Sequence, residues 1–235
     1  MAVSDGPSAR QGRREAGTGS PRAGMRHLGV VGGMTNSVML VLGDVMVAGW
    51  WRGSDNSEND WSTKGSDWER CYQALWGGSE YRQSALVAFD GGELLAFHID
   101  SGGLVDVYSI GDALVLVEVS YTDLDDVKQD AGFLGYVASP FPDAATEAGS
   151  VVVSSGGIVI LPASLSGQGA AAALPKAGLM DAAELPLDEN DRGGDSGLVV
   201  GLPAGRYRVR VDRPVERAWG GACRAAIEPY PHAAR

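Results

Sequence analysis

Residues 196–212 read SGLVVGLPAGRYRVRVD, and this stretch decides the fold class. An apolar run over residues 198–202 leads into Pro203, Ala204 and Gly205. Beyond that point, apolar or aromatic side chains alternate with arginines: Tyr207, Val209 and Val211 against Arg206, Arg208 and Arg210. Side chains on a strand point to opposite faces with period two, so this run buries one face and presents its guanidinium groups on the other. Because proline fixes φ and glycine accepts positive φ, the pattern predicts a β-hairpin over residues 198–211.

The rest of the chain repeats short apolar runs separated by Gly, Asp or Pro. Its 34 glycines in 235 residues suit tight turns better than long helices. Gly43-Asp44, between apolar runs at 38–42 and 45–48, predicts a further hairpin. Residues 113–121 (ALVLVEVSY) predict a central strand covered on both faces. Together these patterns predict an α+β fold that is mainly antiparallel β with a few short helices.

Composition changes along the chain predict two β-rich halves. Residues 1–26 have almost nothing apolar to bury, so we expect a disordered N-terminal extension there. Residues 27–138 form the first half, and residues 151–235 form the second half with the predicted hairpin. The stretch 139–150 (SPFPDAATEAGS) is predicted to be the linker between them.

The clearest helix pattern covers residues 67–75 (DWERCYQAL) in the first half. Ser66 or Asp67 can cap its start, because a side-chain oxygen there accepts a hydrogen bond from a free backbone N–H group. Apolar and aromatic residues recur at helical spacing: Trp68, Cys71, Tyr72 and Leu75. We expect these four side chains to form the packing face of the helix rather than a ligand-binding stack.

The net charge of −11 is unevenly distributed. Residues 1–27 hold five arginines and two acids, and residues 206–235 hold seven arginines and three acids, so the body between them carries −18. Such a body is a poor nucleic-acid binder, because phosphate contacts need Lys and Arg. It can attract a basic protein partner, or the acidity can serve solubility alone.

The sequence predicts a cytoplasmic protein that does not contact a membrane. The arginines near the N-terminus are not followed by the apolar segment of a signal peptide. The most apolar stretch, residues 38–51, is too short to span a bilayer. Cys71 and Cys223 are typical of buried thiols in a reducing compartment, although pairing is the alternative.

One tetrapeptide is similar to a catalytic motif. Gly194-Asp195-Ser196-Gly197 resembles the sequence around the nucleophile of trypsin-like serine proteases, where a histidine base activates the serine. His98 stands in LLAFHID, without the Ala-Ala-His-Cys setting of that family. We favour the alternative, an acidic Gly-rich loop before a strand. The histidines are scattered and C-x-x-C is absent from the sequence, so neither a metal site nor a cofactor is predicted.

Two other features each have two interpretations. Glu118, on the predicted central strand, is either a buried carboxylate or a side chain on the solvent face. The arginine stripe over residues 206–210 binds phosphate or an acidic surface, or it pairs with acidic loops of the protein itself. We favour pairing within the protein.

Two adjacent tryptophans precede an acidic stretch at residues 54–66. Trp and Arg anchor many protein interfaces, so Trp-Trp-Arg here indicates an exposed recognition edge. The alternative is that at least one tryptophan closes the end of the core. The predicted partner-binding residues are these tryptophans and three nearby acids: Trp50, Trp51, Asp55, Glu58 and Asp60.

Several motifs, in order along residues 32–210, resemble the immunity protein 21 family, the partners of bacterial polymorphic toxins. They are Gly32-Gly33, Trp51-Arg52-Gly53, Asp67-Trp68-Glu69-Arg70-Cys71, Tyr121-Thr122-Asp123, Gly156-Gly157-Ile158-Val159-Ile160-Leu161 and Leu202-Pro203-Ala204-Gly205-Arg206-Tyr207-Arg208-Val209-Arg210. The resemblance implies a non-catalytic cytoplasmic protein that binds and blocks a cognate protein toxin, and it implies no catalytic residues. We expect that toxin to be basic. The alternatives are a serine hydrolase using Ser196 and a β-rich regulatory or ligand-binding domain.

Overall fold

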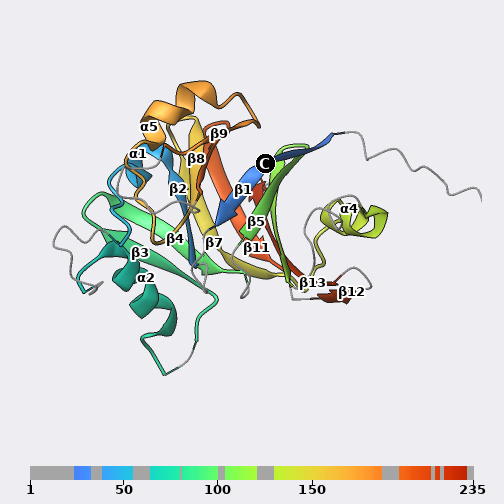
Figure 1. The fold of residues 1–235 in the computed structure, drawn as a ribbon, viewed down its shortest axis with the longest axis horizontal. Coiled ribbons are helices and arrows are strands. Elements are labelled where there is room, and N and C mark those ends of the chain that lie inside the picture. The colour runs from blue at the N-terminus through green and yellow to red at the C-terminus, as the bar shows by residue number, and fades with distance from the viewer. Residues whose placement is uncertain are drawn as a thin grey trace, which may run out of the picture.

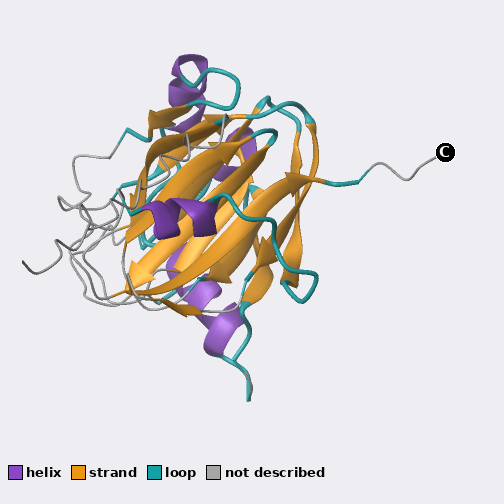
Figure 2. Cartoon of the chain, turned by 90° about the vertical axis from the view of Figure 1, so that its right-hand side faces the viewer, coloured by secondary structure: helices purple, strands orange, loops and turns teal. Residues whose placement is uncertain are grey.

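Two antiparallel β-sheets, sheet A and sheet B, pack face to face (Figures 1 and 2). The computed structural model describes residues 24–32, 39–54, 64–79, 81–99, 104–120, 130–186, 196–212, 215–217 and 220–231. The predicted fold, mainly antiparallel β with a few short helices, is confirmed.

Sheet A has six strands in a continuous order and a short strand paired at its side. In order, these are β1 (Met25–Gly32), β5 (Leu104–Ile110), β6 (Ala113–Ser120), β13 (Gly220–Pro229), β11 (Gly205–Val211) and β7 (Thr146–Val153), with β12 (Val215–Arg217) beside β13. Sheet B also has six strands. In order, these are β3 (Ser84–Phe89), β4 (Gly92–His98), β2 (Met39–Asp44), β8 (Gly157–Pro162), β10 (Leu198–Gly201) and β9 (Ala182–Glu184).

Four short α-helices occur in the described ranges, and they cover the outer faces of the sheets. Three lie on sheet B: α1 (Val45–Ala48), α2 (Asp67–Trp76) and α5 (Ala170–Ala173), which continues into a 3₁₀ turn (Leu174–Lys176). The fourth, α4 (Ala131–Val137), covers part of sheet A. Every helix in these ranges is too short or too polar to cross a membrane.

The described residues form a core of three apolar layers. The largest fills the space between the sheets and includes Leu42, Phe97 and Leu116. The second lies between sheet B and its helices, around Trp51, and the third lies between sheet A and α4, around Phe133. Because both faces of these sheets are covered, several strands are continuously apolar in sequence and do not alternate between apolar and polar residues.

The predicted hairpin over residues 198–211 is wrong, because its two strands belong to different sheets. β10 pairs with β8 and β9 in sheet B, whereas β11 pairs with β13 and β7 in sheet A. All four residues of β10 are buried, as expected for a strand covered on both faces, while β11 alternates between buried and partly exposed positions. Pro203 lies in the crossing between the sheets, where its carbonyl accepts a hydrogen bond from the Tyr207 hydroxyl (2.9 Å).

The hairpin predicted at Gly43-Asp44 is also wrong, because α1 follows β2 directly. Asp44 is the N-cap of α1, and its Oδ1 accepts a hydrogen bond from the N–H of Met46 (2.8 Å). Its Oδ2 accepts from the N–H groups of Ser154 (2.6 Å) and Ser155 (2.8 Å). Asp44, predicted to lie in a hairpin turn, therefore caps α1 and joins this helix to the segment after β7.

The predicted division into two halves does not match the sheets. Each sheet contains strands from both residues 27–138 and residues 151–235. The predicted linker at 139–150 includes the start of β7. The predicted N-terminal extension reaches too far, since Met25 and Arg26 pair with β5, while residues 1–23 lie outside the described ranges.

Two other expectations are confirmed. Residues 67–76 form α2, capped by Ser66, whose Oγ accepts a hydrogen bond from the N–H of Glu69 (3.1 Å). β6 lies between β5 and β13, with Leu116 in the layer between the sheets and Val117 beneath α4. Glu118 is only 2% exposed, so of its two interpretations the buried carboxylate is correct.

Candidate functional site

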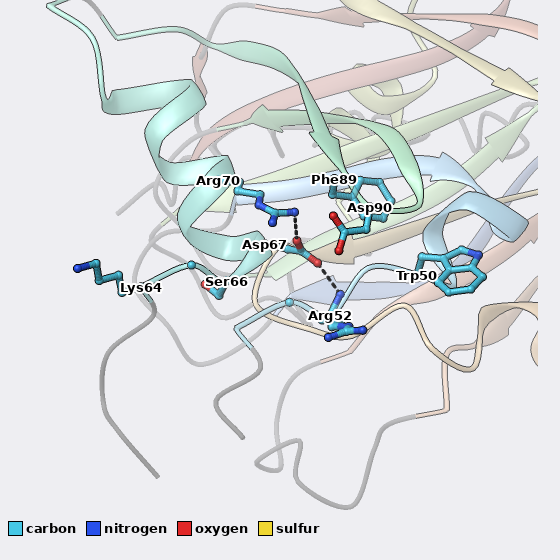
Figure 3. Close-up of a pocket in the computed structure, with 10 residues that line it drawn as sticks. Trp50, Arg52, Lys64, Ser66, Asp67, Arg70, Phe89 and Asp90 are labelled. Atoms are coloured by element: carbon cyan, nitrogen blue, oxygen red, sulfur yellow. Dashed lines mark hydrogen bonds and ion pairs between the residues drawn. The ribbon is translucent and has the colours of Figure 1, made fainter. Parts of the chain in front are cut away.

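A hollow of about 200 Å³ opens beside Trp50, near the start of α2 and the turn between β3 and β4 (Figure 3). Its lining is mostly charged or polar. The charged residues are Arg52, Lys64, Asp67, Arg70 and Asp90. The structure thus places cations and carboxylates together at one end of sheet B.

Asp67 organises this hollow. It is the first residue of α2 and is only 7% exposed. Its Oδ2 accepts a hydrogen bond from the backbone N–H of Arg52 (2.8 Å), and its Oδ1 lies 3.0 Å from Nη1 of Arg70 (Figure 3). The free N–H groups at a helix start favour a carboxylate there. Asp67 therefore joins the segment after α1 to the first turn of α2.

Gly53 allows the two segments to approach. Its φ is 66°, and a Cβ atom at this position would lie 2.3 Å from the carbonyl oxygen of Ser164. Its own carbonyl accepts a hydrogen bond from the N–H of Trp68 (3.0 Å). A side chain at residue 53 would thus be strained in two ways, which explains the Trp-Arg-Gly sequence at this point.

The two predicted tryptophans have opposite environments. Trp50 is 67% exposed, and Met46 in the preceding helix is 59% exposed. Trp51 is fully buried, its Nε1 donates to the carbonyl of Ala163 (3.2 Å), and its ring packs edge-on against Phe89. Trp51 is therefore a core residue, and its predicted role in partner contact is wrong because a partner cannot reach it.

The predicted acids Asp55, Glu58 and Asp60 lie outside the described residues. On either side of that stretch of sequence, the described residues Gly53 and Lys64 line the hollow. Among the described lining residues, cations outnumber carboxylates, with Arg52, Lys64 and Arg70 against Asp67 and Asp90. The sequence did not predict these cations as part of the site.

Ser196 takes part in a structural contact. Its Oγ donates a hydrogen bond to the carbonyl of Val30 (2.9 Å), and its backbone forms a bridge with Gly32 at the end of β1. The ring of His98 contacts Trp76 and Tyr81 instead. Gly194 and Asp195 of the protease-like tetrapeptide lie outside the described residues.

The aromatic residues of α2 differ in part from their predicted role. Cys71 and Leu75 pack into the core as expected, but Tyr72 is 43% exposed. Residues four apart on a helix lie on one line, and rings along this line stack on each other. Trp68 lies 5.5 Å from Tyr72, and Tyr72 lies 5.5 Å from Trp76, between ring centroids. The spacing of Trp68 and Tyr72 predicts a packing face, and it does not predict this stack, which continues to Trp76 at the end of the helix.

The arginine stripe of β11 contacts the protein itself, though not through acidic loops. Arg208 forms an ion pair with Glu228 of β13 (2.8 Å), and Arg210 lies 3.9 Å from the same carboxylate. Arg206 donates to Ser150 Oγ of β7. These contacts join neighbouring strands across the outer face of sheet A.

Both cysteines are buried free thiols. Burial, followed by the negative charge of Asp67, raises the pKa of the Cys71 thiol to about 12. The thiolate is the reactive form of cysteine, so Cys71 is inert at neutral pH. Among the described residues, no group of three or more His, Cys, Asp or Glu side chains is placed to hold a metal ion.

No family model, curated protein or solved structure gives a significant match to this chain. Its class is therefore defined by its own fold and surface. It is a two-sheet antiparallel β protein with an exposed tryptophan beside a charged hollow.

Proposed function

We propose that this chain is a non-catalytic cytoplasmic protein that neutralises a protein toxin by binding it directly, as the resemblance to the immunity protein 21 family implies. The observation that supports this proposal best is the exposure of Trp50, at 67%, next to a charged hollow. Burying a tryptophan on binding removes a large apolar surface from water.

The composition around Trp50 is that of an interface centre with a polar rim. Aromatic residues, Met and Arg are enriched at protein interfaces; Trp50 and Arg52 line the hollow, and Met46 is exposed in the preceding helix. The base of Trp50 lies against Gly91 of the β3–β4 turn, where an added Cβ would come within 2.3 Å of Trp50 Cβ. Trp50 is thus supported at its base while its ring remains available to a partner.

The charge of the chain suits a basic toxin. The net charge of −11 attracts a cationic partner over long range, and Asp55, Glu58 and Asp60 stand in the sequence between Gly53 and Lys64, which line the hollow. Arg52, Lys64 and Arg70 in the hollow can donate hydrogen bonds to carboxylates or backbone carbonyls of the same partner at close range.

The test uses the toxin domain encoded by the gene next to that of this protein. Co-expression of the chain should protect a host cell from that domain, and the two purified proteins should bind. Trp50→Ala should weaken binding by about 2 kcal/mol, or roughly thirtyfold in Kd, mostly through faster dissociation.

Leu179→Ala is the matched control, because Leu179 is 71% exposed but does not line the hollow. This variant should bind like the wild type. If the toxin domain binds both variants equally, the contact surface lies elsewhere. If the neighbouring gene's product does not bind the chain and is not neutralised by it, the proposed function is wrong.

A further inference from the structure

The two carboxylates of the hollow differ in what they contact. Asp67 is 7% exposed, accepts a hydrogen bond from the backbone N–H of Arg52 and forms an ion pair with Arg70. Asp90 is exposed, and its side chain forms no hydrogen bond or ion pair within the described ranges. In the view of Figure 3 its carboxylate is directed into the hollow, between Asp67 and Trp50. Asp90 is therefore the carboxylate of the described lining that can bind a group from outside.

The turn between β3 and β4 holds Asp90 next to Trp50. Gly91 follows Asp90 in this turn, and a Cβ atom on Gly91 would lie 2.3 Å from Cβ and 2.8 Å from Cγ of Trp50. The bare backbone of Gly91 thus lies against the base of the indole side chain, and a larger residue there would displace it. The structure in this way places an unpaired carboxylate beside an aromatic ring that is 67% exposed.

A carboxylate beside an indole ring is complementary to a cationic side chain. The face of a tryptophan attracts a cation that lies within about 6 Å of the ring centroid, and it does so more strongly than the face of Tyr or Phe. The carboxylate accepts charge-assisted hydrogen bonds from the same cation. Arginine fits both groups best, because its planar guanidinium can lie against the ring while its N–H groups donate to both carboxylate oxygens.

Desolvation requires a partner that covers Trp50 to supply this cation. Trp50 and Asp90 line the same hollow, so a protein surface that covers the ring also removes water from the carboxylate. A carboxylate that loses its water without gaining a cation or hydrogen-bond donors is strongly unfavourable. Arg70 is already held by Asp67, and no lining cation forms an ion pair with Asp90 within the described ranges. The partner must therefore bring the compensating charge.

We propose that the toxin binds this hollow with an arginine or lysine side chain that lies against the ring of Trp50 and donates hydrogen bonds to the carboxylate of Asp90. This inference rests on the proposed function, and it names the group that the Trp50 surface receives. The net charge of −11 favours the approach of such a cation. The exposed guanidinium of Arg52 binds a carbonyl or carboxylate of the same toxin segment, so that both open charges of the hollow are paired in the complex.

The test measures binding of the toxin domain encoded by the neighbouring gene to charge variants of the full chain. Asp90→Asn keeps a residue that suits the turn and removes only the charge. It should raise Kd at least tenfold, mostly through faster dissociation, and the effect should persist near 0.5 M salt because a buried pair is little screened. Asp143→Asn is the matched control, since Asp143 is an exposed acid in the turn after α4 and does not line the hollow. It should bind within about twofold of the wild type at this salt concentration.

Double-mutant cycles test whether one toxin side chain contacts both groups. The losses from Trp50→Ala and Asp90→Asn should not multiply: the double variant should bind at least threefold more tightly than the product of the single losses predicts. On the toxin, each exposed Arg and Lys is replaced singly by Gln. One of these toxin variants should bind the wild-type chain at least tenfold more weakly, yet bind the Asp90→Asn chain within about threefold of the unchanged toxin.

Three results would overturn the proposal: an Asp90→Asn variant that binds like the Asp143→Asn control, a loss that disappears near 0.5 M salt, or a loss that disappears when Arg52 is replaced by Gln. The second would show that Asp90 only steers the encounter, and the third that it pairs with Arg52 of its own chain in the complex. If Trp50→Ala weakens binding while Asp90→Asn does not, the proposed function stands and this inference is wrong. If the toxin domain does not bind the wild-type chain, both are wrong.

Discussion

Arg224 is a buried cation held from several sides at once. It lies on β13, is 2% exposed, and its Nε is 3.1 Å from Oδ2 of Asp212. Its guanidinium lies over the rings of Tyr136 and Phe141, at 4.4 and 4.3 Å from their centroids. Its other N–H groups donate to backbone carbonyls at the end of α4 and in the loop that follows it: Tyr136, Ser139 and Pro140. This one side chain attaches α4 and the following loop to sheet A.

Arg224→Met should lower the free energy of unfolding by about 3–5 kcal/mol, because it leaves the Asp212 carboxylate buried without its cation. Urea unfolding at neutral pH measures the change. Arg206→Met is the control, since Arg206 is exposed on the outer face of the same sheet, and it should change stability by about 0.5 kcal/mol or less. If both variants lower the free energy of unfolding by similar amounts, the buried contacts of Arg224 contribute no more to stability than the exposed contacts of Arg206.

Asp44 makes stability depend on pH. Burial raises the pKa of this carboxyl, but the N–H groups of Ser155, Ser154 and Met46 lower it, and the net shift is below the ordinary value of 3.8. A carboxyl with a lowered folded-state pKa contributes stability that is present above pH 3.8 and is lost as the pH falls through the folded pKa. Unfolding free energy should therefore fall below about pH 4.

Asp44→Asn should lower stability by about 1–3 kcal/mol at pH 7, because an amide cannot accept at both positions. It should also flatten the dependence of stability on pH below about pH 4. Urea unfolding at a series of pH values gives both quantities. A variant whose pH profile runs parallel to that of the wild type would assign the acid dependence to other carboxyls.

At the scale of single elements, sequence patterns predicted the features that depend on interactions between neighbouring residues. The cap, the acidic first turn and the helical spacing of α2 are all local, and the helix ends one residue beyond its predicted end. The alternation of β11 correctly predicted its buried face. The partner of each strand was not predictable in this way. A Pro-Ala-Gly turn fits both a hairpin and a crossing between sheets, and the burial of both faces of β10 decides between them.

The tryptophan pair shows the same limit within the site. Periodicity assigns neighbouring residues to faces only inside a regular element, and Trp50 and Trp51 follow the end of α1. Sequence composition therefore made both tryptophans candidates for a contact surface but could not tell which ring is buried. The hollow itself depends on contacts between distant segments, such as the hydrogen bond from Arg52 N–H to Asp67.

Trp51→Ala should lower the free energy of unfolding by about 3–5 kcal/mol, because it removes a fully buried ring and its hydrogen bond to Ala163. Trp50→Ala should change stability by less than about 1 kcal/mol, since its ring is mostly exposed. Thermal and urea unfolding of both variants provide the comparison. Equal losses would contradict the opposite environments of the two rings.

At the scale of the whole molecule, both sheets pair strands that are far apart in the sequence. β1, from the start of the described chain, pairs with β5, and β13, from its end, lies between β6 and β11. Patterns of period two or 3.6 carry no information about such pairings, which depend on packing of the complete chain. The net charge of −11 is likewise a property of the whole molecule, and it acts on a partner before contact.

Neutralising Asp55, Glu58 and Asp60 together, with Asn or Gln, should slow association with the toxin domain tenfold or less at low salt. Charges at the rim of an interface mainly steer the encounter, so the on-rate carries this effect while the off-rate changes little. Near 0.5 M salt the screening length is only a few ångström, and the triple variant should then associate like the wild type. Trp50→Ala should show the opposite behaviour, with faster dissociation at every salt concentration, because an apolar contact is not screened. Stopped-flow association and dissociation rates across a salt series separate the two. If the triple variant changes the off-rate at high salt, these acids contact the toxin directly and are part of the interface centre.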